Sequence, residues 1–155
     1  MSQHELEQVE LTNMCAIIDE KNQKVLVQER KKSWTGIAFP GGHVEKGEAL
    51  VPSTIREIKE ETGLDISHLR LCGIKNWFEA DKNRRYMVFL YATRDFSGEL
   101  IAETDEGKVF WQEINHLGDL KLASGFAEMA EMMLHPSYSE FIYEIDGEVW
   151  EKKFY

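Results

Sequence analysis

Three glutamates near the middle of the chain, Glu57, Glu60 and Glu61, are spaced so that they could bind a metal ion. The spacing i, i+3 and i+4 places them on one face of an α-helix. Like charges at that spacing repel one another and weaken the helix. A divalent cation that prefers hard oxygen ligands would relieve this repulsion. The spacing therefore predicts a metal site on a helix.

The helix that carries these glutamates has a clear start and a clear end. The Pro-Gly-Gly run at 40–42 predicts a turn, and the helix should begin near Ala49, because Pro52 is tolerated only in a first turn. Gly63 fits a left-handed C-terminal cap. The expected apolar stripe consists of Leu50, Val51, Thr54, Ile55, Ile58 and Thr62. We therefore expect one side of the helix to pack on a sheet while the adjacent side faces a cleft.

Strands are expected on both sides of this helix. The segments with strand patterns are 11–19, 24–28, 37–39, 71–77, 85–93 and 108–114. Residues 123–134 predict a second helix. The tail, about 141–155, has Asp146-Gly147 between alternating segments and predicts a hairpin. The mixture favours an α/β or α+β fold, with residues 1–155 forming one domain.

The composition limits the function classes. A chain of 155 residues with 43% hydrophobic and 30% charged residues is typical of a globular domain. The net charge of −10 and the lack of a basic face disfavour polymeric nucleic acid as a partner. There is no apolar run of about 18 residues and no signal-peptide pattern, so no membrane partner is expected. Cys15 and Cys72 do not form a CxxC motif and predict reduced core residues of a cytoplasmic protein.

The segment from Gly42 to Leu64, GHVEKGEALVPSTIREIKEETGL, resembles the Nudix box, GX5EX7REUXEEXGU, at every specified position, where U is aliphatic. The chain is thus similar to Nudix hydrolases, and in particular to the MutT-like subgroup. The resemblance implies the family's α/β/α sandwich with a mixed β-sheet. It also implies an enzyme that hydrolyses a nucleoside diphosphate linked to another group, with Mg²⁺ or Mn²⁺ as cofactor.

The resemblance assigns roles to residues within and beside the box. Glu57, Glu60 and Glu61 would bind the metal, with the Gly41 carbonyl as a further ligand. Glu57 would also orient or deprotonate the attacking water, although the family does not place the base uniformly. Arg56 would hold a glutamate in position by a charge-assisted hydrogen bond.

Two acidic residues outside the core of the motif are further candidates. Glu48 either braces the loop as part of the catalytic site or only favours the helix N-terminus. An additional metal carboxylate often comes from outside the box in this family. The acidic run Glu103, Asp105 and Glu106 could supply it, and Glu106 is our choice. The alternative for each residue of that run is an ordinary polar loop.

Substrate contacts are expected from five residues. Arg30 belongs to a basic cluster before the turn and could meet phosphate, and Gly42 would allow close backbone approach. His43 stands where MutT-like proteins often carry a lysine. An imidazole would contact phosphate less strongly than the lysine ammonium group. Trp77 and Phe78 are candidate stacking surfaces for a base, although such aromatic residues also build cores.

The expected substrate is a small nucleotide, chosen by elimination. The chain lacks the proline of ADP-sugar hydrolases, the tyrosine of dinucleoside polyphosphate hydrolases and the coenzyme A signature. This favours hydrolysis of (oxidised) purine nucleoside triphosphates, such as 8-oxo-dGTP, to monophosphate and pyrophosphate. The alternatives are a hydrolase of ADP-ribose or a dinucleoside polyphosphate, and a non-catalytic nucleotide-sensing module.

The oligomeric state is left open by the C-terminal aromatic residues. They could cover the sheet of their own chain or that of a twofold partner in a homodimer. The residues concerned are Phe141, Tyr143, Trp150, Phe154 and Tyr155.

Overall fold

A computed structural model describes residues 3–32, 34–135 and 137–155. Its helices are α1 (Leu50–Thr62) and α2 (Phe126–Leu134), with short 3-10 turns at Ala80–Lys82 and Ile114–Asp119. Its strands are β1 (Gln8–Asp19), β2 (Lys24–Arg30), β3 (Gly36–Ala38), β4 (Gly41–His43), β5 (Asp65–Ser67), β6 (Arg70–Glu79), β7 (Arg84–Thr93), β8 (Asp95–Ser97), β9 (Glu103–Thr104), β10 (Gly107–Glu113), β11 (Glu140–Asp146) and β12 (Val149–Phe154). No helix in these three segments is long and apolar enough to cross a membrane.

Ten strands form a mixed sheet in the order β12-β11-β6-β7-β1-β2-β10-β9, with β3 added to β2 and β4 added to β1, while β5 and β8 form a separate two-stranded sheet. The pairs β1–β7 and β11–β6 are parallel, and the other pairs in this sheet are antiparallel. β1 and β2 pair only at Ile18–Val25 and Asp19–Lys24 before they diverge. Because the two strands separate, the chain after β3 can cross to β1 and bring the Pro-Gly-Gly turn beside it.

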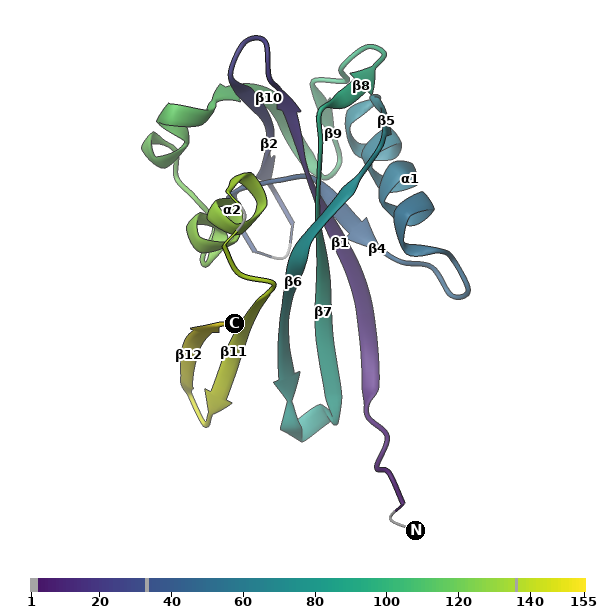
Figure 1. The fold of residues 1–155 in the computed structure, drawn as a ribbon, viewed down its shortest axis with the longest axis vertical. Helices are drawn as coiled ribbons and strands as arrows, with labels where there is room; N and C mark the ends of the chain where they lie inside the picture. Colours follow the sequence, from purple (N-terminus) through teal and green to yellow (C-terminus); the bar gives the residue numbers. More distant parts are fainter. Residues whose placement is uncertain (1–2, 33, 136) are drawn as a thin grey trace.

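The two helices cover opposite faces of the sheet (Figure 1). On the α1 face, Ile17 of β1 and Leu26 of β2 share a buried cluster with Ile58 of α1. On the α2 face, Ile18 and Val27, their neighbours in sequence, share a second cluster with α2. This alternation gives each strand two buried faces. The expected α/β/α sandwich with a mixed sheet is confirmed.

Helix α1 ends as the sequence predicts, but its buried stripe differs. Gly63 adopts φ +80° and its N–H donates to the Lys59 carbonyl, as a left-handed cap does. Val51 is 38% exposed, so the expected stripe is wrong at this position. The small polar Ser53 is fully buried in the first turns instead. The reason is that Ser53 faces β1, where its hydroxyl accepts a hydrogen bond from the Asn13 side chain.

Helix α2 begins three residues later than expected. Leu122 forms a bridge with Ile37, and the N–H of Ala123 donates to the Ile37 carbonyl. Gly125 then adopts φ +77° before the helix starts at Phe126. Residues 122–123 therefore extend the β3 edge of the sheet and are not available to the helix.

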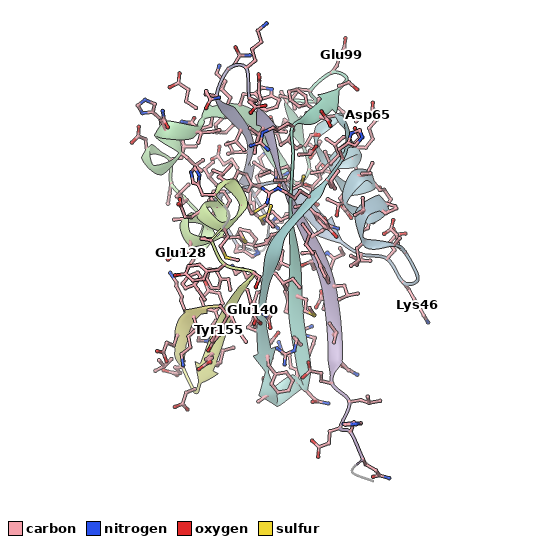
Figure 2. All side chains as sticks on the ribbon, in the orientation of Figure 1. Lys46, Asp65, Glu99, Glu128, Glu140 and Tyr155 are labelled. Atoms are coloured by element: carbon pink, nitrogen blue, oxygen red, sulfur yellow. The ribbon has the colours of Figure 1, made fainter. Side chains whose placement is uncertain are left out.

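The C-terminal hairpin adds two strands to the edge of the sheet at β6 (Figure 1). Phe141 is fully buried in the α2-side cluster, and Phe154 packs partly against it. Trp150 and Tyr155 remain about half exposed. In Figure 2 Glu128 of α2 and the terminal Tyr155 both lie near this hairpin. The hairpin thus covers the sheet of its own chain, and the homodimer stays a prediction.

Candidate active site

Two glycines, Gly41 and Gly42, form β4 and bring its backbone against β1 and α1. Gly41 pairs with Met14, and Gly42 pairs with Asn13. A Cβ at Gly41 would overlap the Asn13 carbonyl, and a Cβ at Gly42 would overlap the Glu57 carboxylate. We call these two residues the glycine pair. Only glycine leaves room for a carboxylate against this backbone.

Asn13 fixes the glycine pair relative to α1. Its side-chain Oδ1 accepts a hydrogen bond from the Gly42 N–H at 3.1 Å, and its Nδ2 donates to Ser53 Oγ at 3.1 Å. Asn13 is buried, with 3% of its surface exposed. The sequence reasoning did not select it. The signal was an amide inside an otherwise apolar strand, which requires buried hydrogen-bond partners.

Glu61 is a buried carboxylate beside the glycine pair. Its Oε2 accepts a hydrogen bond from the Gly41 N–H at 3.1 Å. Burial, aided by the charges of Glu57 and Glu106, raises the pKa of Glu61 to about 8, while the hydrogen bond from the Gly41 N–H and the charge of Arg30 oppose the rise. The charged form of Glu61 is therefore disfavoured unless a cation binds beside it.

Glu57 lies on the other side of the glycine pair, against Gly42. Burial raises its pKa, and the hydrogen bond from Arg56 partly opposes that rise. The distance from Arg56 Nη1 to Glu57 Oε1 is 3.1 Å. Glu57 and Glu61 are therefore two partly desolvated carboxylates on one short stretch of backbone, an arrangement that favours cation binding.

Arg56 connects the helix, the preceding loop and β4. Its Nε and Nη2 donate to the two carboxylate oxygens of Glu48 at 2.8 and 2.9 Å. Nη2 also donates to the His43 carbonyl at 3.1 Å. The hydrogen bond from Arg56 lowers the pKa of Glu48 to about 2, so this pair stays charged. Lys46 lies in the same loop and points away from the molecule (Figure 2).

Glu60 does not join the other two glutamates at the glycine pair. Its carboxylate is 58% exposed and accepts from Arg56 Nη1 at 3.2 and 3.3 Å. In the described part of the chain, no three acidic, histidine or cysteine side chains lie close enough to hold a metal ion as they stand. The expected convergence of all three glutamates is therefore not seen, and Arg56 Nη1 lies between Glu57 and Glu60, within hydrogen-bond distance of both carboxylates.

Glu106 and Arg30 reach the site from the ends of two paired strands. Arg30 of β2 lies opposite Gly107 of β10, so the residue before Gly107 comes close to it. The charges of both residues act on Glu61. Glu106 also lies 3.7 Å from Lys32 Nζ, and Glu103 is paired with Lys31. Of the acidic run, Glu106 is thus the member whose charge acts measurably on Glu61.

A cavity of about 400 Å³ opens beside Arg30 on the α2 face of the sheet. The Arg30 guanidinium also stacks on Trp34, 4.0 Å from the ring centre. Arg30 therefore borders a space large enough for a nucleoside, and its charge also acts on Glu61. The cavity is lined by Glu29, Arg30, Thr35, Gly36, Ile37, Phe110, Leu120 and Lys121.

The remaining candidate substrate contacts lie apart from one another. His43 Nε2 lies 2.9 Å from Glu10 Oε1, and the His43 side chain is 65% exposed. Trp77 stacks on Tyr86 with ring centres 4.5 Å apart, on the face that carries the α2-side cluster. Phe78 is the next residue in β6 and points to the opposite face. Trp77 and Phe78 therefore lie on different faces of the sheet, and each stays a separate candidate for stacking on a base.

Comparisons with known proteins bear on the family and the fold of this chain. The NUDIX domain family matches residues 10–135, so the C-terminal hairpin lies outside the match. The uncharacterized Nudix hydrolase YvcI of Bacillus subtilis is 30% identical over 127 residues, 80% of this chain and 78% of that protein. An ADP-ribose pyrophosphatase of Methanocaldococcus jannaschii is 31% identical over 105 residues, 67% of this chain and 62% of that protein. The mutator MutT protein of Bacillus halodurans has a similar fold, with a TM-score of 0.73 at 24% identity over 94% of this chain and 97% of that one.

Proposed function

The chain belongs to the Nudix hydrolase family, and from this premise we propose that it is a metal-dependent hydrolase of nucleoside diphosphate-linked compounds. One observation carries the proposal. Two desolvated carboxylates, Glu57 and Glu61, lie against a glycine pair that admits no side chain. Cleavage of a phosphoric anhydride needs positive charge on the phosphoryl oxygens and a positioned water. The carboxylates supply binding oxygens for the cation that provides this charge.

The donor set fits Mg²⁺ or Mn²⁺, because it offers hard oxygen ligands. Glu57 and Glu61 would hold the ion, with the Gly41 carbonyl as a further ligand. Glu60 would join after it turns away from Arg56, and Glu106 would add a carboxylate from outside the helix. The bound cation would neutralise phosphate charge and lower the pKa of a coordinated water.

The residues of the chain itself would position the reacting groups. Glu57 is our candidate for orienting or deprotonating the attacking water, since it is held by Arg56 against Gly42. Glu48 fixes Arg56 through two hydrogen bonds, so it contributes through Arg56 and not through the substrate. Arg56 would thus keep its hydrogen bonds to Glu48 and Glu57 during turnover, and only its contact with Glu60 would be released.

The substrate would extend from the carboxylates past Arg30 into the adjoining cavity. Arg30 would contact a phosphate, and Trp34 and Phe110 offer apolar surfaces to a base. A purine nucleoside triphosphate, oxidised or not, is our first candidate, with hydrolysis to monophosphate and pyrophosphate. ADP-ribose is the second candidate, because a relative 31% identical to this chain is an ADP-ribose pyrophosphatase.

A nucleotide panel tests the proposal. The purified protein is incubated with Mg²⁺ and each of 8-oxo-dGTP, dGTP, ATP, ADP-ribose and a diadenosine polyphosphate, and the products are separated by chromatography. Glu57→Gln should retain binding and lose turnover, whereas Glu131→Gln on the exposed surface of α2 should match the wild type. Turnover of ADP-ribose alone would identify ADP-ribose, and not a purine nucleoside triphosphate, as the substrate. No turnover of any compound would indicate a nucleotide-sensing module.

A further inference from the structure

Gln28 of β2 is fully buried, yet neither its Oε1 nor its Nε2 has a hydrogen-bond partner in the described segments. Buried side-chain amides are almost always hydrogen-bonded, because an unpaired amide lowers the stability of the folded state. The residues before it in the strand, 25–27, are apolar and buried. An amide at this position therefore indicates a partner that arrives with a ligand.

The α1 helix covers the face of β2 to which Gln28 belongs. Leu26 precedes Gln28 by two residues, and Val109 lies directly opposite Gln28 in β10. Both share a buried cluster with Ile58 of α1. Since side chains alternate along a strand, Gln28 faces α1 as Leu26 does. Its polar groups thus point toward the helix that carries Glu61.

The backbone contacts of Val109 and Ala38, the two residues opposite Gln28, lead to the Glu61 end of α1. Val109 N–H donates to the Ala102 carbonyl, and the neighbouring Ile101 N–H donates to the carbonyl of Thr62. Ala38 comes three residues before Gly41, whose N–H binds Glu61. Gln28 therefore pairs with two residues whose chain neighbours contact the Glu61 end of α1.

We propose that Gln28 is a positioning residue of the metal site, which supports the Glu61 carboxylate from within the sheet when that carboxylate binds a cation. The inference rests on the proposed function. An amide suits this place because Nε2 can donate to a carboxylate without adding charge. A lysine would neutralise Glu61 and compete with the cation. The amide Oε1 can accept from a water bound to the cation, as residues behind a metal ligand often do.

Gln28→Met tests the inference, because methionine has a similar length and no comparable hydrogen-bonding group. The metal-free variant should have a Tm equal to or above that of the wild type, since an unpaired amide is removed. Its Kd for Mn²⁺, measured by isothermal titration, should rise about tenfold or more. Leu26→Met changes the same face of the same strand, and its Kd for Mn²⁺ should remain within about twofold of the wild type.

The outcomes separate the inference from the proposed function. Wild-type Mn²⁺ affinity in Gln28→Met would overturn the inference while leaving the proposed function intact. No Mn²⁺ binding by the wild type would overturn both. If Gln28→Met does not fold, a structure of the wild type with Mn²⁺ tests whether Gln28 supports the metal site. A hydrogen bond from Gln28 to Glu61 or to a Mn²⁺-bound water supports the inference, and an amide bonded to neither overturns it.

Discussion

Replacing Glu61 should change how the stability of the metal-free protein depends on pH. Burial raises the pKa of Glu61 in the folded protein to about 8, from an ordinary value of 4.5. Because the folded pKa is the higher one, the folded state holds more protons than the unfolded state between these two values. The contribution of Glu61 is therefore most favourable below pH 4.5, is lost as the pH rises, and is fully lost above pH 8.

The size of this effect follows from the shift in pKa. The free energy of unfolding should fall by about 1.4 kcal/mol per pH unit, and by on the order of 3–5 kcal/mol across the whole window. Glu61→Gln removes the titrating group and keeps the shape of the side chain. The variant should therefore exceed the wild type in stability at pH 8 and lose that advantage toward pH 4.5.

Urea unfolding followed by circular dichroism, in the presence of EDTA, measures these free energies between pH 4.5 and 9. The difference between Glu61→Gln and the wild type cancels other titrating groups that the substitution leaves unchanged. Glu131→Gln is the control and should keep the wild-type slope, because it leaves Glu61 in place. A difference between Glu61→Gln and the wild type that does not vary with pH would refute the reasoning.

Three further substitutions test the rest of the site. Arg56→Lys keeps the positive charge but loses the two parallel hydrogen bonds to Glu48, so kcat should fall about 10- to 100-fold. Steady-state kinetics with Mg²⁺ measures kcat, and an unchanged value would contradict the role of Arg56 in positioning Glu57. Gly42→Ala places a methyl group in the space of the Glu57 carboxylate, so activity should fall about 100-fold. Circular dichroism should still report a folded protein, and full activity would contradict the close packing. Arg30→Ala should raise KM for the nucleotide about tenfold with a smaller change in kcat, since it removes one charge-assisted phosphate contact of roughly 1.5–3 kcal/mol. Lys32→Ala should leave KM within about twofold of the wild type. Equal effects of the two substitutions on KM would argue against a phosphate contact by Arg30.

The features that the sequence predicted well are local ones. The end of α1 at Gly63 and the hairpin turn near Gly147 each depend on a few adjacent residues. The strand boundaries also agree within about three residues, because hydrophobic patterns report which faces are buried. The turn expected at 40–42 is wrong, because Gly41 and Gly42 belong to strand β4 and pair with β1. The sandwich fold came from the family resemblance, and no local pattern shows that β1 pairs with β7.

The features that were missed depend on partners distant in the sequence. The ion pair of Glu60 with Arg56, one helical turn before it, was not expected, and the role of Glu60 as a metal ligand stays a prediction. Asn13 and Gln28 gained meaning only when the sheet placed them beneath α1. Competition among side chains for one arginine, and the pairing of strands, cannot be read from spacing alone.

The faces of Trp77 and Phe78 follow from the strand that carries both. Adjacent residues of a strand point to opposite faces, so these two candidate stacking surfaces lie on different faces of the sheet. The start of α2 was predicted three residues too early, because the bridge between Ile37 and Leu122 joins segments far apart in the chain.

The central claim is that Glu57 and Glu61, lying against the glycine pair, bind the divalent cation that activates a nucleotide for hydrolysis. Anomalous diffraction from crystals soaked with Mn²⁺ and a non-hydrolysable nucleotide tests it most directly. The account predicts an anomalous peak coordinated by both carboxylates, with nucleotide phosphates next to it and Arg30 in contact with them. A peak elsewhere, or none at saturating Mn²⁺, would contradict the account.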